Sequence, residues 1–140
     1  MISVKDAIKI IEANCKVLSN QKVNTVDSLG LSLSKNIISD LNFPPFNQSA
    51  MDGYALNFKD GLSKYTIIGE VKAGDKDVNY NIKPGEGVRI FTGAKLPSCC
   101  TTVIQQEWCI KNKNKISFTQ KPKNQLNIRK KGEQIQKGDT

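Results

Sequence analysis

The first apolar positions of the chain recur with the spacing of a helix. In residues 1–18 each apolar residue of one stripe lies three or four positions from another member: Val4, Ala7, Ile8, Ile11, Cys15 and Leu18. Ser3, with Asp6 three positions later, resembles a capping box in which aspartate replaces the usual glutamate. The pattern predicts an amphipathic helix over 1–18. Its apolar stripe must cover either a core or a partner subunit.

The next thirty residues have a weaker pattern. Asp27 is placed to cap a short second helix with Leu29 and Leu33 on one side, although Gly30 weakens it. A short strand is expected over 36–40. In 43–46, two adjacent prolines fix φ, remove backbone donors and bias the preceding residue toward extended backbone. We therefore expect a rigid, non-helical strap there.

From Tyr54 onward no helical period remains, and short apolar or alternating runs are separated by turns. Turns are expected at 84–87 and at a lysine- and asparagine-rich hairpin tip, 111–115. The predicted strands are 65–71, 77–82, 88–91, 102–104, 107–110, 116–119 and 126–129. The fold class is therefore α+β: an N-terminal helical arm, then a small, mainly antiparallel twisted sheet or barrel. The division falls near residue 45.

Charge adds a possible partner class. The 140 residues carry a net charge of +8, and segment 111–137 holds eight lysines and Arg129 against one acid, Glu133. Such an excess could bind nucleic acid. Phe118 is the segment's only aromatic residue, and the chain uses lysine and asparagine heavily throughout, so we do not favour nucleic acid as a partner.

Other features restrict location and chemistry. No apolar run approaches the roughly 20 residues of a membrane span, and Asp6 and Glu12 interrupt 1–18, so neither a membrane nor a secretory signal is expected. The absence of histidine excludes histidine bases and histidine-containing zinc sites. The four cysteines form no CxxC pair and are interpreted as small buried hydrophobic residues in a reducing cytoplasm: Cys15, Cys99, Cys100 and Cys109.

Two short stretches are candidates for chemistry. Asp52 lies on an Asp-Gly turn between apolar runs, which suits metal binding or proton transfer, although it could simply make the turn. Gly93 would let backbone N–H groups approach an oxyanion, and Thr92 would add a hydroxyl donor. The alternative is an ordinary turn at the end of a strand.

The chain contains only two arginines, Arg89 and Arg129. In a lysine-rich chain, the planar fork of Arg89 suggests bidentate pairing with a phosphate or carboxylate. A structural pair with Glu86 or Glu107 is the alternative. Arg129 lies near Glu133, and a structural role is favoured for it.

A series of motifs resembles the molybdopterin molybdenumtransferase family, which includes the gephyrin E domain. The resemblance rests on Pro45-Phe46-x-x-Ser49-x-Met51-Asp52-Gly53-Tyr54-Ala55, Gly69-Glu70-x-x-Ala73-Gly74, Pro84-Gly85-Glu86-Gly87-x-Arg89-Ile90-Phe91-Thr92-Gly93-Ala94-x-x-Pro97, Gln106-Glu107 and Asn127-Ile128-Arg129-x-x-Gly132-Glu133. These motifs follow the family order from Pro45 onward.

The resemblance implies transfer of molybdenum from molybdate to adenylylated molybdopterin (molybdopterin-AMP), with Mg²⁺ and release of AMP. It implies that Asp52 and Thr92 are catalytic, with Asp52 positioning the cation or the substrate and Thr92 hydrogen-bonding an anionic ligand. Ser49, within the same motif, is a further candidate for substrate binding, and Gly93 and Arg89 are candidates through their own chemistry. The resemblance further implies an elongated homodimer. Residues 1–45 would belong to an incomplete dimerisation domain, 46–134 to the β-rich module and 135–140 to the return toward the first domain.

The same resemblance exposes differences. Residues 97–101 lack the family's glycine and following acid, with Thr101 at the end, and Gln134 replaces an aspartate. The pterin-site motif Thr-Gly-Asp-Glu-Leu is absent, and members continue for more than a hundred residues. We expect the N-terminal part of such an enzyme, inactive alone, that works with a pterin-binding domain in the same protein or a partner subunit. The alternatives are a non-catalytic oligomerisation or scaffold module and, third, a basic nucleic-acid-binding domain.

Overall fold

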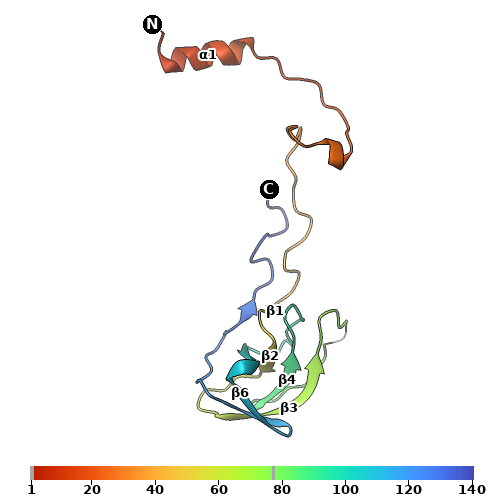
Figure 1. The fold of residues 1–140 in the computed structure, drawn as a ribbon, viewed down its shortest axis with the longest axis vertical. Coiled ribbons are helices and arrows are strands. Elements are labelled where there is room, and N and C mark those ends of the chain that lie inside the picture. The colour runs from red at the N-terminus through yellow and green to blue at the C-terminus, as the bar shows by residue number, and fades with distance from the viewer. Residues whose placement is uncertain (1, 77) are drawn as a thin grey trace. The chain divides into compact units, whose positions relative to one another are not determined.

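The structure is a computed structural model that describes residues 2–76 and 78–140. The chain divides into two compact units, Met1–Ile37 and Ile38–Thr140, which are described separately. Figure 1 shows the elements of each unit along the chain. None of the helices in the described ranges is long and apolar enough to cross a membrane.

The first unit contains one α-helix, α1 (Val4–Asn14). Ser3 caps it as predicted: its hydroxyl oxygen accepts from the Asp6 N–H at 3.1 Å and its O–H donates to the Asp6 carboxylate at 2.6 Å. The helix is shorter than the predicted 1–18, of which Met1 lies outside the described residues. It stops at Cys15, where the backbone becomes extended. Cysteine, valine and asparagine are weak helix formers, and short helices without packing are marginal.

The predicted second helix is wrong. Asn24, not Asp27, precedes a single 3₁₀ turn, η1 (Thr25–Asp27), and Asp27 is its last residue. Gly30 follows with a φ of +83°. No described residue of this unit is buried, which leaves the apolar stripe of α1 exposed.

The second unit is built on a six-stranded sheet in the order β5-β2-β4-β3-β7-β6. Figure 1 labels β2, β3, β4 and β6 of this sheet. Its strands are β2 (Gly53–Leu56), β3 (Lys64–Val71), β4 (Glu86–Ile90), β5 (Thr102–Gln105), β6 (Cys109–Asn112) and β7 (Lys115–Phe118). Every pairing is antiparallel except β3 with β4, which is parallel. The sheet is therefore mixed, because the long connection between β3 and β4 allows a crossover that a tight hairpin does not.

The strands predicted over 65–71, 88–91, 102–104 and 116–119 are confirmed within one or two residues. In 107–110 the strand begins only at Cys109, after the 3₁₀ turn η2 (Gln106–Trp108). The last predicted strand, 126–129, is reduced to β8 (Ile128–Arg129), which pairs with β1 (Gln48–Ser49).

The strand predicted over 77–82 is wrong for its described part, and Asp77 lies outside the described residues. Residues 78–82 belong to no strand. The Tyr80 hydroxyl donates to the Glu70 carbonyl at 2.8 Å, and its ring lies against Gly69, where an added Cβ would come within 2.5 Å. The alternating apolar residues cover the sheet rather than extend it.

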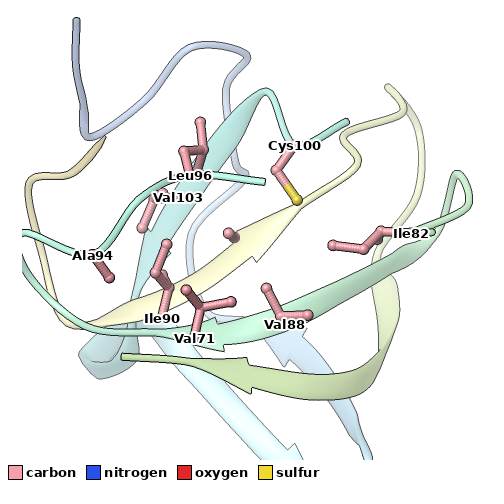
Figure 2. Close-up of a cluster of buried hydrophobic side chains, with 9 residues drawn as sticks. Val71, Ile82, Val88, Ile90, Ala94, Leu96, Cys100 and Val103 are labelled. Atoms are coloured by element: carbon pink, nitrogen blue, oxygen red, sulfur yellow. The ribbon is translucent and has the colours of Figure 1, made fainter. Parts of the chain in front are cut away.

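Two buried clusters occupy opposite faces of the central strands. Figure 2 shows the first, whose labelled side chains are Val71, Ile82, Val88, Ile90, Ala94, Leu96, Cys100 and Val103. The second contains Tyr54, Leu56, Tyr65, Ile104 and Ile116. Because Ala55 joins the first cluster while its neighbours join the second, β2 is buried on both faces and shows no alternation.

The predicted non-helical strap over 43–46 is confirmed. The Phe43 N–H donates to the Ile135 carbonyl at 2.8 Å. The strand predicted at 36–40 is absent, although the Ser39 N–H donates to the Asp139 carbonyl at 2.9 Å. Backbone near residue 40 is thus paired with the last residues of the chain.

The cysteines are all free thiols. Cys100 is buried, and Cys99 and Cys109 are half-buried, which agrees with the prediction of small hydrophobic residues. Burial raises the pKa of Cys100 and raises that of Cys109 to about 11. Cys15 is exposed, so the prediction is wrong there, because the first unit forms no buried core of its own among its described residues.

Candidate functional site: the Asp52–Thr92 corner

Strand pairing brings together two predicted site residues that are distant in sequence. β2 and β4 are antiparallel, with Gly53 opposite Ile90. Asp52 immediately precedes β2, and Thr92 follows β4 by two positions. This register places both residues at the same end of the strand pair, which we name the Asp52–Thr92 corner.

The two side chains are in direct contact. The Thr92 N–H and the Thr92 hydroxyl both donate to Oδ1 of Asp52, each at 2.8 Å, and both residues are exposed. These two donors, the backbone one first, hold the pKa of Asp52 below its ordinary value, and the charge of Arg89 lowers it further. Asp52 is therefore ionised at neutral pH, which suits a cation ligand better than a proton donor.

Gly53 has a different function from the expected one. The Asp-Gly pair predicted a turn, but Gly53 begins β2 and does not have a positive φ. A Cβ at this position would lie 1.9 Å from the Ile104 carbonyl oxygen of neighbouring β5. The glycine is needed for close approach of two strands, and Asp52 consequently leads directly into the buried sheet.

The backbone after β4 forms an ordinary turn at the end of a strand, which was the alternative to an anion cradle. The Ala94 N–H donates to the Phe91 carbonyl at 3.0 Å, and Gly93 has a φ of +79°, as the third position of a type II turn requires. The Gly93 N–H donates to the Ser49 carbonyl at 2.9 Å. The predicted anion cradle therefore has both backbone N–H groups, of Thr92 and Gly93, occupied within the protein.

Ser49 is completely buried. Its hydroxyl donates to the Met51 carbonyl at 2.6 Å and accepts from the Met51 N–H at 3.3 Å. These bonds close the turn that leads into Asp52. The geometry thus gives Ser49 a shaping role and no exposed oxygen, while the substrate contact inferred from the family resemblance stays a prediction.

Arg89 is half-buried beside the corner. Its Nη1 donates to the Gly53 carbonyl at 3.0 Å and its Nη2 to Oε1 of Gln106 at 2.7 Å. The guanidinium lies over the rings of Tyr54 and Phe91, with distances of 5.3 and 4.7 Å to the ring centres. The suggested structural pairs of Arg89 with Glu86 or Glu107 are wrong, because neither carboxylate forms an ion pair with it among the described residues.

The other arginine has the structural role predicted for it. Nε of Arg129 lies 2.7 Å from Oε1 of Glu133. Hydrogen bonding from Arg129 and from the Lys130 N–H lowers the pKa of Glu133.

Gln106 is a part of the corner to which sequence analysis gave no role. It follows the edge strand β5, and its N–H donates to the Asp52 carbonyl at 3.0 Å. The only signal was its place in the Gln106-Glu107 motif, since a polar residue after a strand is common.

Asp52 and Thr92 are both exposed at the corner. Two pockets lie elsewhere, one along the β6–β7 hairpin and one formed by residues 58–63 with 118–122, and neither is lined by Asp52 or Thr92. Among residues 2–76 and 78–140, no group of three or more His, Cys, Asp or Glu could hold a metal ion. A cation at Asp52 would need oxygens from water or from another molecule.

Comparisons with known proteins place this geometry in a family. A family profile described as the MoeA N-terminal region (domain I and II) matches residues 2–140. A molybdopterin molybdenumtransferase of Staphylococcus epidermidis is 32% identical over 99% of this chain and 34% of its own length. Gephyrin of Dictyostelium discoideum is 34% identical over 99% of this chain and 22% of its own length. The chain thus spans about a third or less of these curated relatives.

A crystal structure of a molybdopterin biosynthesis MoeA protein from Pyrococcus horikoshii superposes with a TM-score of 0.82 at 26% identity, over 97% of this chain and 38% of that one. The profile match, the relatives and the superposition agree with the motifs found in the sequence. The chain belongs to the family of the MoeA N-terminal region (domain I and II).

Proposed function

We propose that this chain supplies the Asp52–Thr92 corner to a site that inserts molybdenum from molybdate into adenylylated molybdopterin during molybdenum cofactor biosynthesis. The supporting observation is the pair of 2.8 Å bonds from Thr92 to Asp52, which joins the two residues implicated by the resemblance across 40 positions of sequence. The names of the relatives, molybdopterin molybdenumtransferase, support the substrate class.

Asp52 suits Mg²⁺ as a single protein ligand. Mg²⁺ usually keeps several waters and binds through one or two carboxylates together with substrate phosphates. Oδ1 accepts both bonds from Thr92, and Oδ2 carries no hydrogen bond among the described residues, so Oδ2 would hold the cation. The ion would neutralise phosphate charge, while Thr92 keeps the carboxylate ionised and oriented.

The remainder of the proposed site lies outside this chain. We propose that a pterin-binding domain, in the same protein or in a partner subunit, completes it, and that the chain alone does not transfer molybdenum. The exposed apolar stripe of α1, which includes Ile8 and Ile11, supports a homodimer because it needs a surface to cover it. The free cysteines support a cytoplasmic location.

A chimera tests the proposal. This chain would replace the matched third of the Staphylococcus epidermidis relative, and molybdenum incorporation into molybdopterin-AMP would be measured together with AMP release. Asp52→Asn should abolish incorporation while the fold persists. Asp60→Asn, at an exposed carboxylate that contacts Lys121 and accepts from the Gly61 N–H, should leave it unchanged. Full activity with Asp52→Asn would contradict the proposed role, and turnover by the 140-residue chain alone would contradict the need for a second domain.

The alternative is a non-catalytic scaffold of the same fold. Thr101 and Gln134 favour it, because both replace positions where family members carry acids, and both are exposed here. A stable dimer by light scattering, combined with chimera activity that is insensitive to Asp52→Asn, would favour the scaffold.

A further inference from the structure

Gln106 connects separate parts of the corner. Its backbone N–H donates to the Asp52 carbonyl at 3.0 Å. Its side-chain Oε1 accepts from Arg89 at 2.7 Å, and its Nε2 donates to Oε1 of Glu107 at 3.2 Å. Gln106 is also the first residue of η2 and follows β5 directly, so its backbone continues from the end of that strand.

The neighbours of Gln106 determine its amide orientation. The guanidinium of Arg89 offers only donors, and the carboxylate of Glu107 offers only acceptors. Turning the amide by half a turn would place donor against donor and acceptor against acceptor. The observed orientation therefore presents an oxygen to Arg89.

Among the described residues, Arg89 has no direct ionic partner, and its charge acts on Asp52 only through space, where it lowers the pKa of that carboxyl. Both hydrogen-bond acceptors of Arg89, the Gly53 carbonyl and the Gln106 amide, are neutral, and no ion pair of residues 2–76 and 78–140 involves it. Two of its five N–H groups are used in this way, and the rings of Tyr54 and Phe91 restrict the plane of the guanidinium. The three other N–H groups make no hydrogen bond to any described residue.

We propose that Gln106 is a positioning residue that holds Arg89 as an oxyanion site beside Asp52. The ligand class is a phosphoryl group or a free tetrahedral oxyanion, bound by the guanidinium fork. A glutamate at position 106 could make the same hydrogen bond but would neutralise the guanidinium, so the neutral amide is the feature that keeps the site cationic. This inference rests on the proposed function, since it states where that site binds an anionic substrate group.

NMR titrations of the 140-residue chain with inorganic phosphate test the inference through the Arg89 Nε–H signal. The wild type should show a saturable shift there. Gln106→Glu should weaken phosphate binding about tenfold, because it replaces a neutral partner by an opposite charge. Gln21→Glu makes the same change in net charge at an exposed position of the first unit and should stay within about twofold of wild type.

Equal phosphate binding by the wild type and Gln106→Glu would overturn the proposal, because the added carboxylate would then not affect the guanidinium that is proposed to bind phosphate. A wild-type titration without any shift at Arg89 would also overturn it. Gln106→Met provides a second variant in case Gln106→Glu does not fold. It removes the acceptor but leaves the net charge, and it should weaken binding because the guanidinium is no longer held.

Titrations with molybdate and AMP distinguish the ligand sources. Tighter binding of AMP than of phosphate assigns the site to a phosphoryl ester, whereas tighter binding of molybdate assigns it to the free oxyanion.

The chimera separates the inference on Gln106 from the proposed function. Activity that requires Asp52 but is unaffected by Gln106→Glu would refute only the inference on Gln106. Phosphate binding at Arg89 together with an inactive chimera would refute only the proposed function.

Discussion

Apolar residues are buried in the sheet unit of this chain and exposed in its first unit. In the sheet unit, Leu56, Ile90 and Ile104 are fully buried, whereas in the first unit Val4 is 78% exposed and Ile11 is 61% exposed. The apolar residues of α1 recur with the helical period, whereas Leu56 and Ile104 of the sheet unit lie on strands that are buried on both faces. The difference shows that periodicity specifies which face is apolar, but burial requires a second surface, which only the sheet unit provides for itself.

The predicted site residues lie in only one of the two units. The predicted site residues, Asp52, Thr92 and Arg89, are anchored to strands with buried faces, so their separations are maintained by the core. Nothing comparable positions a side chain in the first unit. That unit offers an apolar helix face, which suits association rather than chemistry.

The largest expected effect is the difference in unfolding free energy between alanine substitutions in the two units. Ile104→Ala should lower the free energy of unfolding of the sheet by about 2–5 kcal/mol, because it removes buried atoms and leaves a cavity. Ile11→Ala, at an exposed position of α1, should change it by less than about 0.5 kcal/mol. Urea titrations followed by Trp108 fluorescence measure both. Similar losses in the two variants would mean that α1 is packed against a surface in solution.

Two glycine substitutions, one in each unit, test the same difference in packing. Gly53→Ala should destabilise the sheet by about 1–3 kcal/mol or more, because the new Cβ meets the Ile104 carbonyl at 1.9 Å and two strands must separate. Gly30→Ala introduces strain at a φ of +83° in the first unit, where nothing lies within 4 Å. We expect no change in the melting temperature of the sheet for Gly30→Ala. Thermal unfolding by circular dichroism would refute the steric account if Gly53→Ala melted like the wild type.

The acid dependence of Asp52 is the next effect in size. Its pKa is lower in the folded chain than the ordinary 3.8, so its contribution to stability is complete above that pH and is lost as the pH falls through the folded pKa. Thr92→Val removes the hydroxyl donor but keeps the N–H, so the pKa of Asp52 should rise and the acid-dependent loss should shrink. Carboxyl NMR titration measures the pKa. Thr101→Val, at an exposed threonine, should leave it unchanged, and an unaltered pKa in Thr92→Val would contradict the 2.8 Å hydroxyl bond.

The smallest effect on the sheet should come from the helix cap. Ser3→Ala removes the acceptor for the Asp6 N–H and should cost α1 about 0.5–2 kcal/mol, seen as a loss of ellipticity at 222 nm. Ser3→Asp should retain the helix because aspartate also caps. Unfolding of the sheet should be the same in all three chains. A shift of its midpoint in Ser3→Ala would show that the two units unfold together.

Much of the sheet unit was predictable because its signals are local. Apolar runs bounded by glycine and proline located β3, β4, β5 and β7, and the prolines at 44 and 45 correctly predicted an extended strap. Errors arose where a local signal had a nonlocal cause. Residues 78–82 alternate because Tyr80 and Ile82 cover the sheet, and Asp52-Gly53 resembles a turn although its glycine accommodates β5.

The candidate site was predictable only in part for the same reason. Motif resemblance selected Asp52, Thr92 and Arg89, but their contacts depend on the register of β2 with β4, which side-chain identity does not encode locally. The substrate contacts of Ser49 and Gly93 stay predictions; what sequence could not reveal is that burial and internal hydrogen bonds already occupy the Ser49 hydroxyl and the Gly93 N–H.

The amino-acid sequence by itself determined the capped amphipathic helix, the main strands, the absence of histidine chemistry and the family. These depend on interactions within a few residues or on residue identity. Only the tertiary structure decided that Asp52 accepts from Thr92, that Arg89 pairs with Gln106 rather than with a glutamate, and that β3 runs parallel to β4. Those outcomes depend on which strands become neighbours, and that is settled by how the whole core packs.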